Sequence, residues 1–222
     1  MVLNEIHQLL IKELVIEWRQ KYAINGIFLY LISSMFVVYL TFSLKNEVIP
    51  PSTWNALFWI IILFSSVNGV AKSFIQESEG RQLYYYTIAN PQAILASKIL
   101  YNFFLTLILS FVGLLFYSLI MGSAIQNFGL FAVNIFLAAF GFASTLTLVS
   151  SIASKGSSSA TLMAILSFPI ILPIILVVIR ISNYALNGLG WSSGYDEILL
   201  LLAIDAIIAA VAFLLFPYLW RS

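Results

Sequence analysis

Long apolar blocks, separated by short polar stretches, dominate the chain and predict membrane-spanning helices. A spanning helix needs ~20 mostly apolar residues. The uncharged segments Ala23–Leu44 and Trp54–Ala71 predict the first two spans, with Trp54 and Trp59 at the membrane interface. From Ile99 to Ser154 no charged residue occurs, and at ~1.5 Å per residue this run is too long for one crossing. The polar break Gly122–Asn127 divides it into a third and a fourth span.

The last third of the chain predicts two further spans, Ser157–Ile179 and Ile198–Trp220. The residues between them, Ser182–Glu197, are expected to form an outer loop. Its Trp191 and its tyrosines are typical of interfacial anchors; contact with an aromatic macrocycle is the alternative interpretation. The sequence therefore predicts an all-α integral membrane protein with six transmembrane helices.

Composition supports this class and excludes others. Hydrophobic residues make up 62% of the chain and charged residues 9%, against about a quarter charged in soluble domains. A net charge of +1 gives no electrostatic basis for binding nucleic acid. The chain has no cysteine, which excludes disulfides and thiolate metal sites.

The N-terminal segment, residues 1–22, predicts an amphipathic helix lying in the membrane interface. Ile6, Leu10, Leu14 and Trp18 recur every four positions among charged residues, which places them on one apolar stripe. The interleaved charges do not fit a signal peptide. A soluble amphipathic helix packed on a partner is the alternative.

The basic residues predict the orientation of the spans. Cytoplasmic loops carry an excess of Lys and Arg. With both termini on one side, only Lys45 and Arg180 lie on the other. The remaining eight share the side of the termini: Lys12, Arg19, Lys21, Lys72, Arg81, Lys98, Lys155 and Arg221. Both termini are therefore expected in the cytoplasm.

The polar stretch Lys72–Lys98 is the longest charged interruption between spans. Most connections between helices or strands run to about six residues, so this one is expected to be a docking surface for a cytoplasmic partner. Within it, Glu77 and Arg81 are four residues apart and can also pair across one helical turn. Docking of Glu77 on a partner and local pairing with Arg81 are both open at this point.

Few residues in the spans carry chemistry. No phosphate-binding Gly-x-x-x-x-Gly-Lys-Ser/Thr motif occurs, so energy would have to come from another subunit. Asp205 is the clear ionisable residue within a span; it is either a hydrogen-bonded or wetted carboxylate near the outer interface, or part of an outer pathway. Pro169 and Pro173 each remove a backbone donor, producing either a static bend or a flexing point of a gate.

The polar stretch carries a family resemblance. Phe74-x-x-Glu77-x-x-Gly80, followed by Leu83, Pro91 and Lys98, resembles the cytoplasmic connection of ABC-2-type permeases. The whole chain is similar to the CcmB family, permease subunits of the haem exporter ABC system of cytochrome c maturation. The similarity extends over Leu10–Leu14, Glu17, Arg19, Gly141-Phe142, Ser150, Lys155-Gly156, Leu166, Pro169 and Leu172-Pro173.

The resemblance implies one ABC-2-type (type V exporter-like) permease domain over residues 1–222. Residues 1–22 would be its elbow helix and residues 72–98 its coupling segment. ATPase coupling is expected at Glu77, Gly80, Arg81, Leu83, Pro91 and Lys98. One departure is Arg81-Gln82, where the family commonly has a Leu-Glu pair; Tyr84–Tyr86 could supply contact area there instead.

The resemblance also implies an energy source, a cargo, partners and a location. The chain would have no enzymatic activity, cofactor or metal of its own; a separate subunit would use ATP, and haem would be the cargo. Its partners would be that ATP-binding subunit, a haem-handling membrane protein, a second permease copy and lipid. The location would be the bacterial inner membrane. An ABC-2 permease for another amphiphile and a non-transporting assembly scaffold are the alternatives.

Overall fold

The computed structural model describes residues 2–19, 21–44, 49–70, 74, 90–155 and 159–221. Within these ranges the chain is helical, without strands, which confirms the predicted all-α class. The helices are α1 (Val2–Arg19), α2 (Lys21–Ser43), α3 (Pro51–Val70), α6 (Pro91–Met121), α7 (Phe128–Ala153), α8 (Ser159–Leu186) and α9 (Trp191–Arg221). Every one except α1 contains a stretch long and apolar enough to cross a membrane, so the six predicted spans are confirmed.

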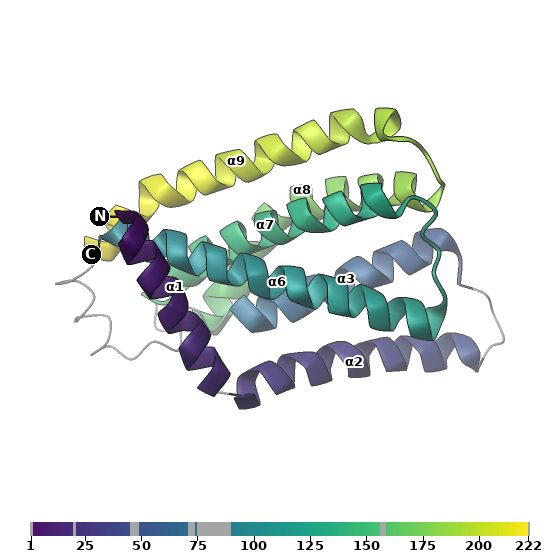
Figure 1. Cartoon of the computed structure of the whole chain (residues 1–222), viewed down its shortest axis with the longest axis horizontal. Helices are drawn as coiled ribbons and strands as arrows, with labels where there is room; N and C mark the ends of the chain where they lie inside the picture. Colours follow the sequence, from purple (N-terminus) through teal and green to yellow (C-terminus); the bar gives the residue numbers. More distant parts are fainter. Residues whose placement is uncertain are drawn as a thin grey trace.

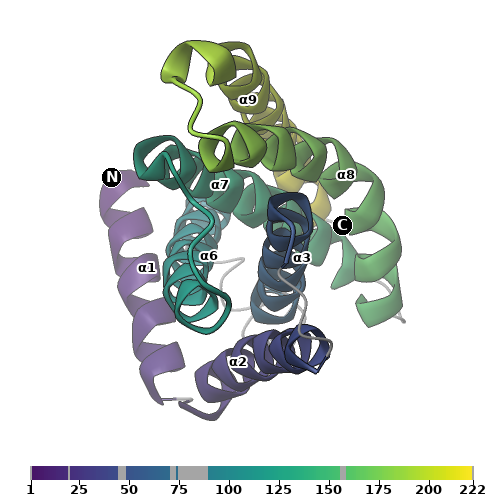
Figure 2. The ribbon, with the colours of Figure 1, turned by 90° about the vertical axis from the view of Figure 1, so that its right-hand side faces the viewer.

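The six long helices run along the long axis of the molecule, and α1 crosses them at one end (Figure 1). Both termini lie at that end. Helix α7 is the centre of the bundle: it packs against α3, α6, α8 and α9, and the end-on view shows it among them (Figure 2). Most of α7 is buried, whereas most of α2 and α9 faces outward.

The helix ends follow from local sequence. Asn90 caps α6 by accepting a hydrogen bond from the Gln92 amide at 3.1 Å, and Pro91 occupies the first helical position, where a missing N–H is harmless. Gly122, with φ of +79°, ends α6. Asn127 then caps α7 through the Leu130 amide. The predicted break between the third and fourth spans is therefore confirmed.

The predicted outer loop Ser182–Glu197 is wrong, because most of it is helical. Helix α8 continues to Leu186, and α9 begins at Trp191. Gly188, with φ of +69°, ends α8 in a Schellman arrangement, in which the Leu189 amide donates to the Tyr184 carbonyl at 3.0 Å. The connection is thus short, and polar side chains expected in water lie in α8.

Trp54 and Trp59 are also placed differently from the prediction. Both rings are buried in the bundle interior instead of facing the membrane interface. Trp54 packs on Tyr117 with ring centroids 4.8 Å apart, and Trp59 packs on Phe58 at 5.1 Å. Each indole N–H has an internal acceptor, the Gly122 carbonyl for Trp54 and the Ser182 hydroxyl for Trp59. Internal acceptors remove the need for interfacial water.

Candidate functional site

The predicted coupling residues fall into two groups. Glu77, Gly80, Arg81 and Leu83 lie outside the described residues. Pro91 begins α6, and Lys98 lies on the same helix, ~10 Å further along it. Lys98 is 2% exposed, so its ammonium group is inside the protein and not on an open docking surface.

Lys98 forms an ion pair with Glu13 of α1. Its Nζ lies 3.3 Å from Oε1 of Glu13, and the Lys12 ammonium contacts the same oxygen at 2.8 Å. Burial alone would raise the pKa of Glu13, but the charges of Lys98 and Lys12, with their hydrogen bonds, hold this pKa below its usual value. Glu13 is therefore ionised at neutral pH and ties α1 to α6.

Phe74, in the segment between α3 and α6, contacts the same Lys98 ammonium group. Its ring centroid lies 4.5 Å from the Lys98 ammonium, within the range of a cation–π interaction. The ring also packs on Phe216 of α9, centroid to centroid 5.6 Å. Phe74 shares a buried cluster with Leu95, Leu148 and others, against which Leu9 of α1 packs. Four helices therefore meet around one residue of the polar segment.

The elbow helix α1 itself packs mainly on α6 and less on α2. Ile6, Leu9 and Leu10 are partly buried, whereas Leu14 is half exposed. The predicted apolar stripe thus has one part on the bundle and another part facing outward. This distribution fits a helix that rests on the protein at one edge and on the membrane interface at the other.

Asp205 lies deeper than the sequence suggested. Because α9 begins at Trp191, Asp205 is ~21 Å along that helix, and it is 1% exposed. A wetted carboxylate near the outer interface is therefore wrong. Within the described part of the chain, neither of its carboxylate oxygens has a hydrogen-bond partner. A buried polar group without partners is costly inside the protein, so Asp205 is an unusual residue of the bundle interior.

Gly141 of α7 makes room for the Asp205 carboxylate. A β-carbon at Gly141 would overlap that carboxylate and would also lie 3.3 Å from Ile174 of α8. Gly194 of α9 also faces Leu130 of α7, where a β-carbon would lie 3.5 Å away, an ordinary van der Waals contact. Helices α7 and α9 therefore approach closely where one of them carries glycine, as is common between transmembrane helices. Sequence alone gave no sign that Gly141 and Asp205 are neighbours.

A buried polar network joins α3, α7 and α8, and sequence reasoning missed it. The Ser182 hydroxyl accepts from the Trp59 indole and from the Asn134 amide, both at 2.7 Å. Asn134 also donates to the Val178 carbonyl at 2.8 Å. One turn away, Asn55 donates to Asn183 Oδ1 at 2.9 Å. The sequence did carry one signal for this network. Asn55 and Asn134 lie inside predicted spans, and side-chain amides in a membrane need hydrogen-bond partners.

The prolines of α8 lie between this network and the end of the bundle that carries the termini. Pro169 and Pro173 are within a continuous helix and on its exposed face. The network holds the stretch of α8 around Ser182, beyond both prolines. Whether the proline segment is a static bend or a flexing point stays a prediction.

Trp191 lies at the first position of α9 and is 51% exposed. It packs on the first turn of α7, where a β-carbon at Gly129 would lie 3.3 Å from its ring. Nearby, Tyr195 is also exposed. Two exposed aromatic rings at the first turns of a candidate span are typical of an interfacial anchor.

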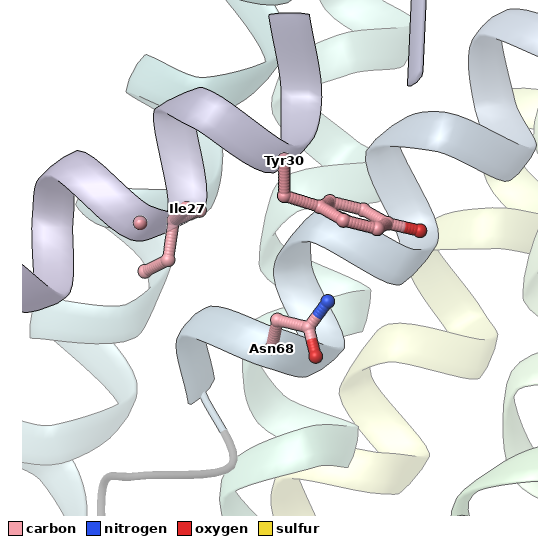
Figure 3. Close-up of a pocket in the computed structure, with 4 residues that line it drawn as sticks. Ile27, Tyr30 and Asn68 are labelled. Carbon is pink, nitrogen blue, oxygen red and sulfur yellow. The ribbon is translucent and has the colours of Figure 1, made fainter. Parts of the chain in front are cut away.

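One surface pocket of about 220 Å³ lies between α2 and α3, lined by Gly26, Ile27, Tyr30 and Asn68. The side chains of Tyr30 and Asn68 face the same space from the two helices (Figure 3). A second, larger hollow of about 510 Å³ lies beside the C-terminal part of α6. Phe111, Ser123 and Phe128 are among the residues that line it. None of the predicted site residues lines either space.

The described residues contain no cluster of three or more His, Asp or Glu side chains that could hold a metal ion.

Comparison with protein families gives one match that covers almost the whole chain. Residues 4–218 match the family described as CcmB protein. No curated protein matches the chain. The family match begins in the first turn of α1 and ends in the last turn of α9, and it includes all the helices between them.

Proposed function

This chain belongs to the CcmB family, and from that premise we propose that it is the permease subunit of an ATP-driven ABC complex that serves cytochrome c maturation. The observation that carries the proposal is the family match over residues 4–218, together with a six-span bundle. The sequence holds no phosphate-binding Gly-x-x-x-x-Gly-Lys-Ser/Thr motif, so an ATP-driven function would take its energy from another subunit. A separate ATP-binding subunit supplies it in this proposal.

In this proposal the ATP-binding subunit docks on the part of the segment 72–98 that precedes α6, since Lys98 itself is buried. Three observations support that position. The segment is the longest polar stretch between spans, the helices on either side of it, α3 and α6, meet it at the bundle end that carries both termini, and Phe74 within it is packed against α6 and α9. A force on this segment would therefore reach the bundle directly. A second permease copy completes the transmembrane unit.

The side of the membrane on which the termini lie is inferred from the distribution of Lys and Arg residues. Six of the ten Lys and Arg residues lie in described segments at the end of the bundle that carries the termini. Two more, Lys72 and Arg81, belong to the connection between α3 and α6, outside the described residues. The positive-inside rule then supports cytoplasmic termini in the bacterial inner membrane. The opposite end, with Trp191 and the connection after α8, would face the periplasm and a haem-handling membrane partner.

Haem is the cargo or the released ligand in this proposal. The complex either exports haem or uses ATP to release haem from its membrane partner to a periplasmic chaperone. Trp191 is proposed in the outer part of the pathway, with Pro169 and Pro173 at a gate. Family membership supports haem as the substrate class; the geometry of the bundle itself supports only a permease.

Purification of the tagged permease with its membrane partners tests the proposal. The expected preparation contains an ATP-binding subunit, hydrolyses ATP and shows a haem absorbance band. The matched control is the same complex with the phosphate-binding lysine of the ATP-binding subunit replaced, which should assemble without turnover. Retention of another amphiphile in place of haem would indicate a different ABC-2 substrate. ATP hydrolysis unaffected by any change in the spans would favour an assembly scaffold.

A further inference from the structure

Three residues that are far apart in the sequence meet at the end of the bundle that carries both termini. Glu13 belongs to the elbow helix, Phe74 to the polar segment after α3, and Lys98 to α6. The Lys98 ammonium lies 3.3 Å from the Glu13 carboxylate and 4.5 Å from the Phe74 ring centroid. One buried cation therefore contacts both the elbow helix and the polar segment.

We propose that Glu13, Lys98 and Phe74 form a joint that couples the elbow helix to the segment on which the ATP-binding subunit docks. This inference rests on the proposed function, because it takes the segment 72–98 as the docking site. The three are positioning residues: they transmit displacement and contact neither ATP nor cargo.

Burial makes the joint suitable for transmission. Lys98 is 2% exposed and the Glu13 side chain 17% exposed, so water screens their attraction poorly. A buried ion pair adds little net stability compared with apolar residues of similar volume, but it fixes one relative position of the elements that carry it. Apolar side chains would hold α1 on α6 equally well while allowing it to slide.

Phe74 links this fixed pair to the docking segment. Its ring is anchored on Phe216 of α9 and in the cluster with Leu95 of α6. A displacement of residue 74 would therefore disturb the contact of its ring with the Lys98 ammonium, and through Lys98 it would act on Glu13 and on α1. The elbow helix and the docking segment would then move together.

The test uses the assembled complex and four permease variants: Glu13→Gln, Lys98→Met, the double variant with both changes, and Lys12→Met as the matched control. Lys12 contacts the same Glu13 oxygen at 2.8 Å but belongs to α1, so its loss leaves the link between α1 and α6 in place. Three quantities are measured for each: permease and ATP-binding subunit in the purified complex, ATP turnover, and mature cytochrome c formed in cells.

The double variant decides the outcome, because it removes both charges of the buried pair and should insert even if the single variants do not. Only Lys12 then lacks its Glu13 partner, and the Lys12 side chain is 26% exposed. We expect it to bind the ATP-binding subunit and hydrolyse ATP within about twofold of the native rate, while mature cytochrome c falls at least tenfold. Lys12→Met should match the native protein in all three quantities. A double variant with native cytochrome c levels would overturn the joint, since the pair would then serve folding alone.

Failure of the proposed function has a different signature. In that case the native permease would co-purify without an ATP-binding subunit, and the variants would have no ATP turnover to uncouple. Phe74→Leu adds an independent check, since it keeps the apolar packing and removes only the ring beneath the ammonium. Phe74→Leu should lower cytochrome c formation, as the double variant does. Unchanged cytochrome c formation would mean that Phe74 is not part of the joint.

Discussion

The carboxylate of Asp205 on α9 lies directly against the backbone of Gly141 on α7, in the interior of the bundle. Glycine is required there because any β-carbon would occupy the space of the carboxylate oxygens. The pair fixes how closely α7 and α9 approach at mid-bundle. It also places the most unusual ionisable group of the spans on the helix interface and not in an open cavity.

Replacement of Gly141 by alanine should destabilise the permease. The added methyl group must displace Asp205 or separate α7 from α9, and overpacking of this kind destabilises by about 1–3 kcal/mol. Gly26→Ala is the matched control, since it is also a helical glycine in a span but has nothing within 4 Å of the added carbon. Thermal unfolding in detergent should show a lower midpoint for Gly141→Ala only. Equal midpoints would mean that the α7–α9 contact is looser than described.

Asp205→Asn separates a structural carboxyl group from a charge-dependent one. The amide keeps the size and the hydrogen-bonding shape, and the buried site has no partner for a negative charge among the described residues. We therefore expect complex assembly and cytochrome c formation within about twofold of the native protein. Normal assembly with complete loss of maturation would instead show that the ionised form acts in the outer pathway.

Removal of the Ser182 hydroxyl should weaken the contact of α8 with α3 and α7. Ser182→Ala leaves the Trp59 indole and one Asn134 contact without their acceptor, and each stranded buried donor costs about 1–3 kcal/mol. Ser33→Ala is the control, because that exposed hydroxyl only donates to the Tyr30 carbonyl on its own helix. A lower unfolding midpoint for Ser182→Ala alone is expected. Indistinguishable midpoints would contradict the role of the network.

Much of this fold could be predicted because span length and charge position are local properties of the sequence. The break at Gly122–Asn127 was predictable in the same way, since a glycine and a capping asparagine act within one turn. The outer loop Ser182–Glu197 was wrong because Ser182 satisfies its hydroxyl inside the bundle, which only the packing of three helices reveals. The contact of Glu13 with Lys98 depends on residues 85 positions apart, and no periodicity encodes it.

Orientation can be tested with single cysteines, because the native chain has none. With the termini in the cytoplasm, cysteines at Gln82 and Ser157 should be protected from a membrane-impermeant thiol reagent in intact cells. A cysteine at Asn187, which is exposed in the connection after α8, should be labelled. Permeabilised cells provide the control, in which all three should react. Labelling of the Gln82 position from outside would reverse the orientation.

Glu77→Ala tests whether the polar segment docks on the ATP-binding subunit. If Glu77 only pairs with Arg81 across one helical turn, its removal should change function little, since an exposed pair contributes about 0.5 kcal/mol. If it contacts a basic group of the partner in a partly buried setting, truncation strands that group and costs ~2 kcal/mol or more. We expect the second result: weaker binding of the ATP-binding subunit and less mature cytochrome c, with normal insertion of the permease. Glu79→Ala, two residues along the same segment, is the control for loss of acidic charge alone. Full maturation with Glu77→Ala would restrict Glu77 to local pairing, and docking would then have to rest on other residues of the segment, Tyr84–Tyr86 first among them.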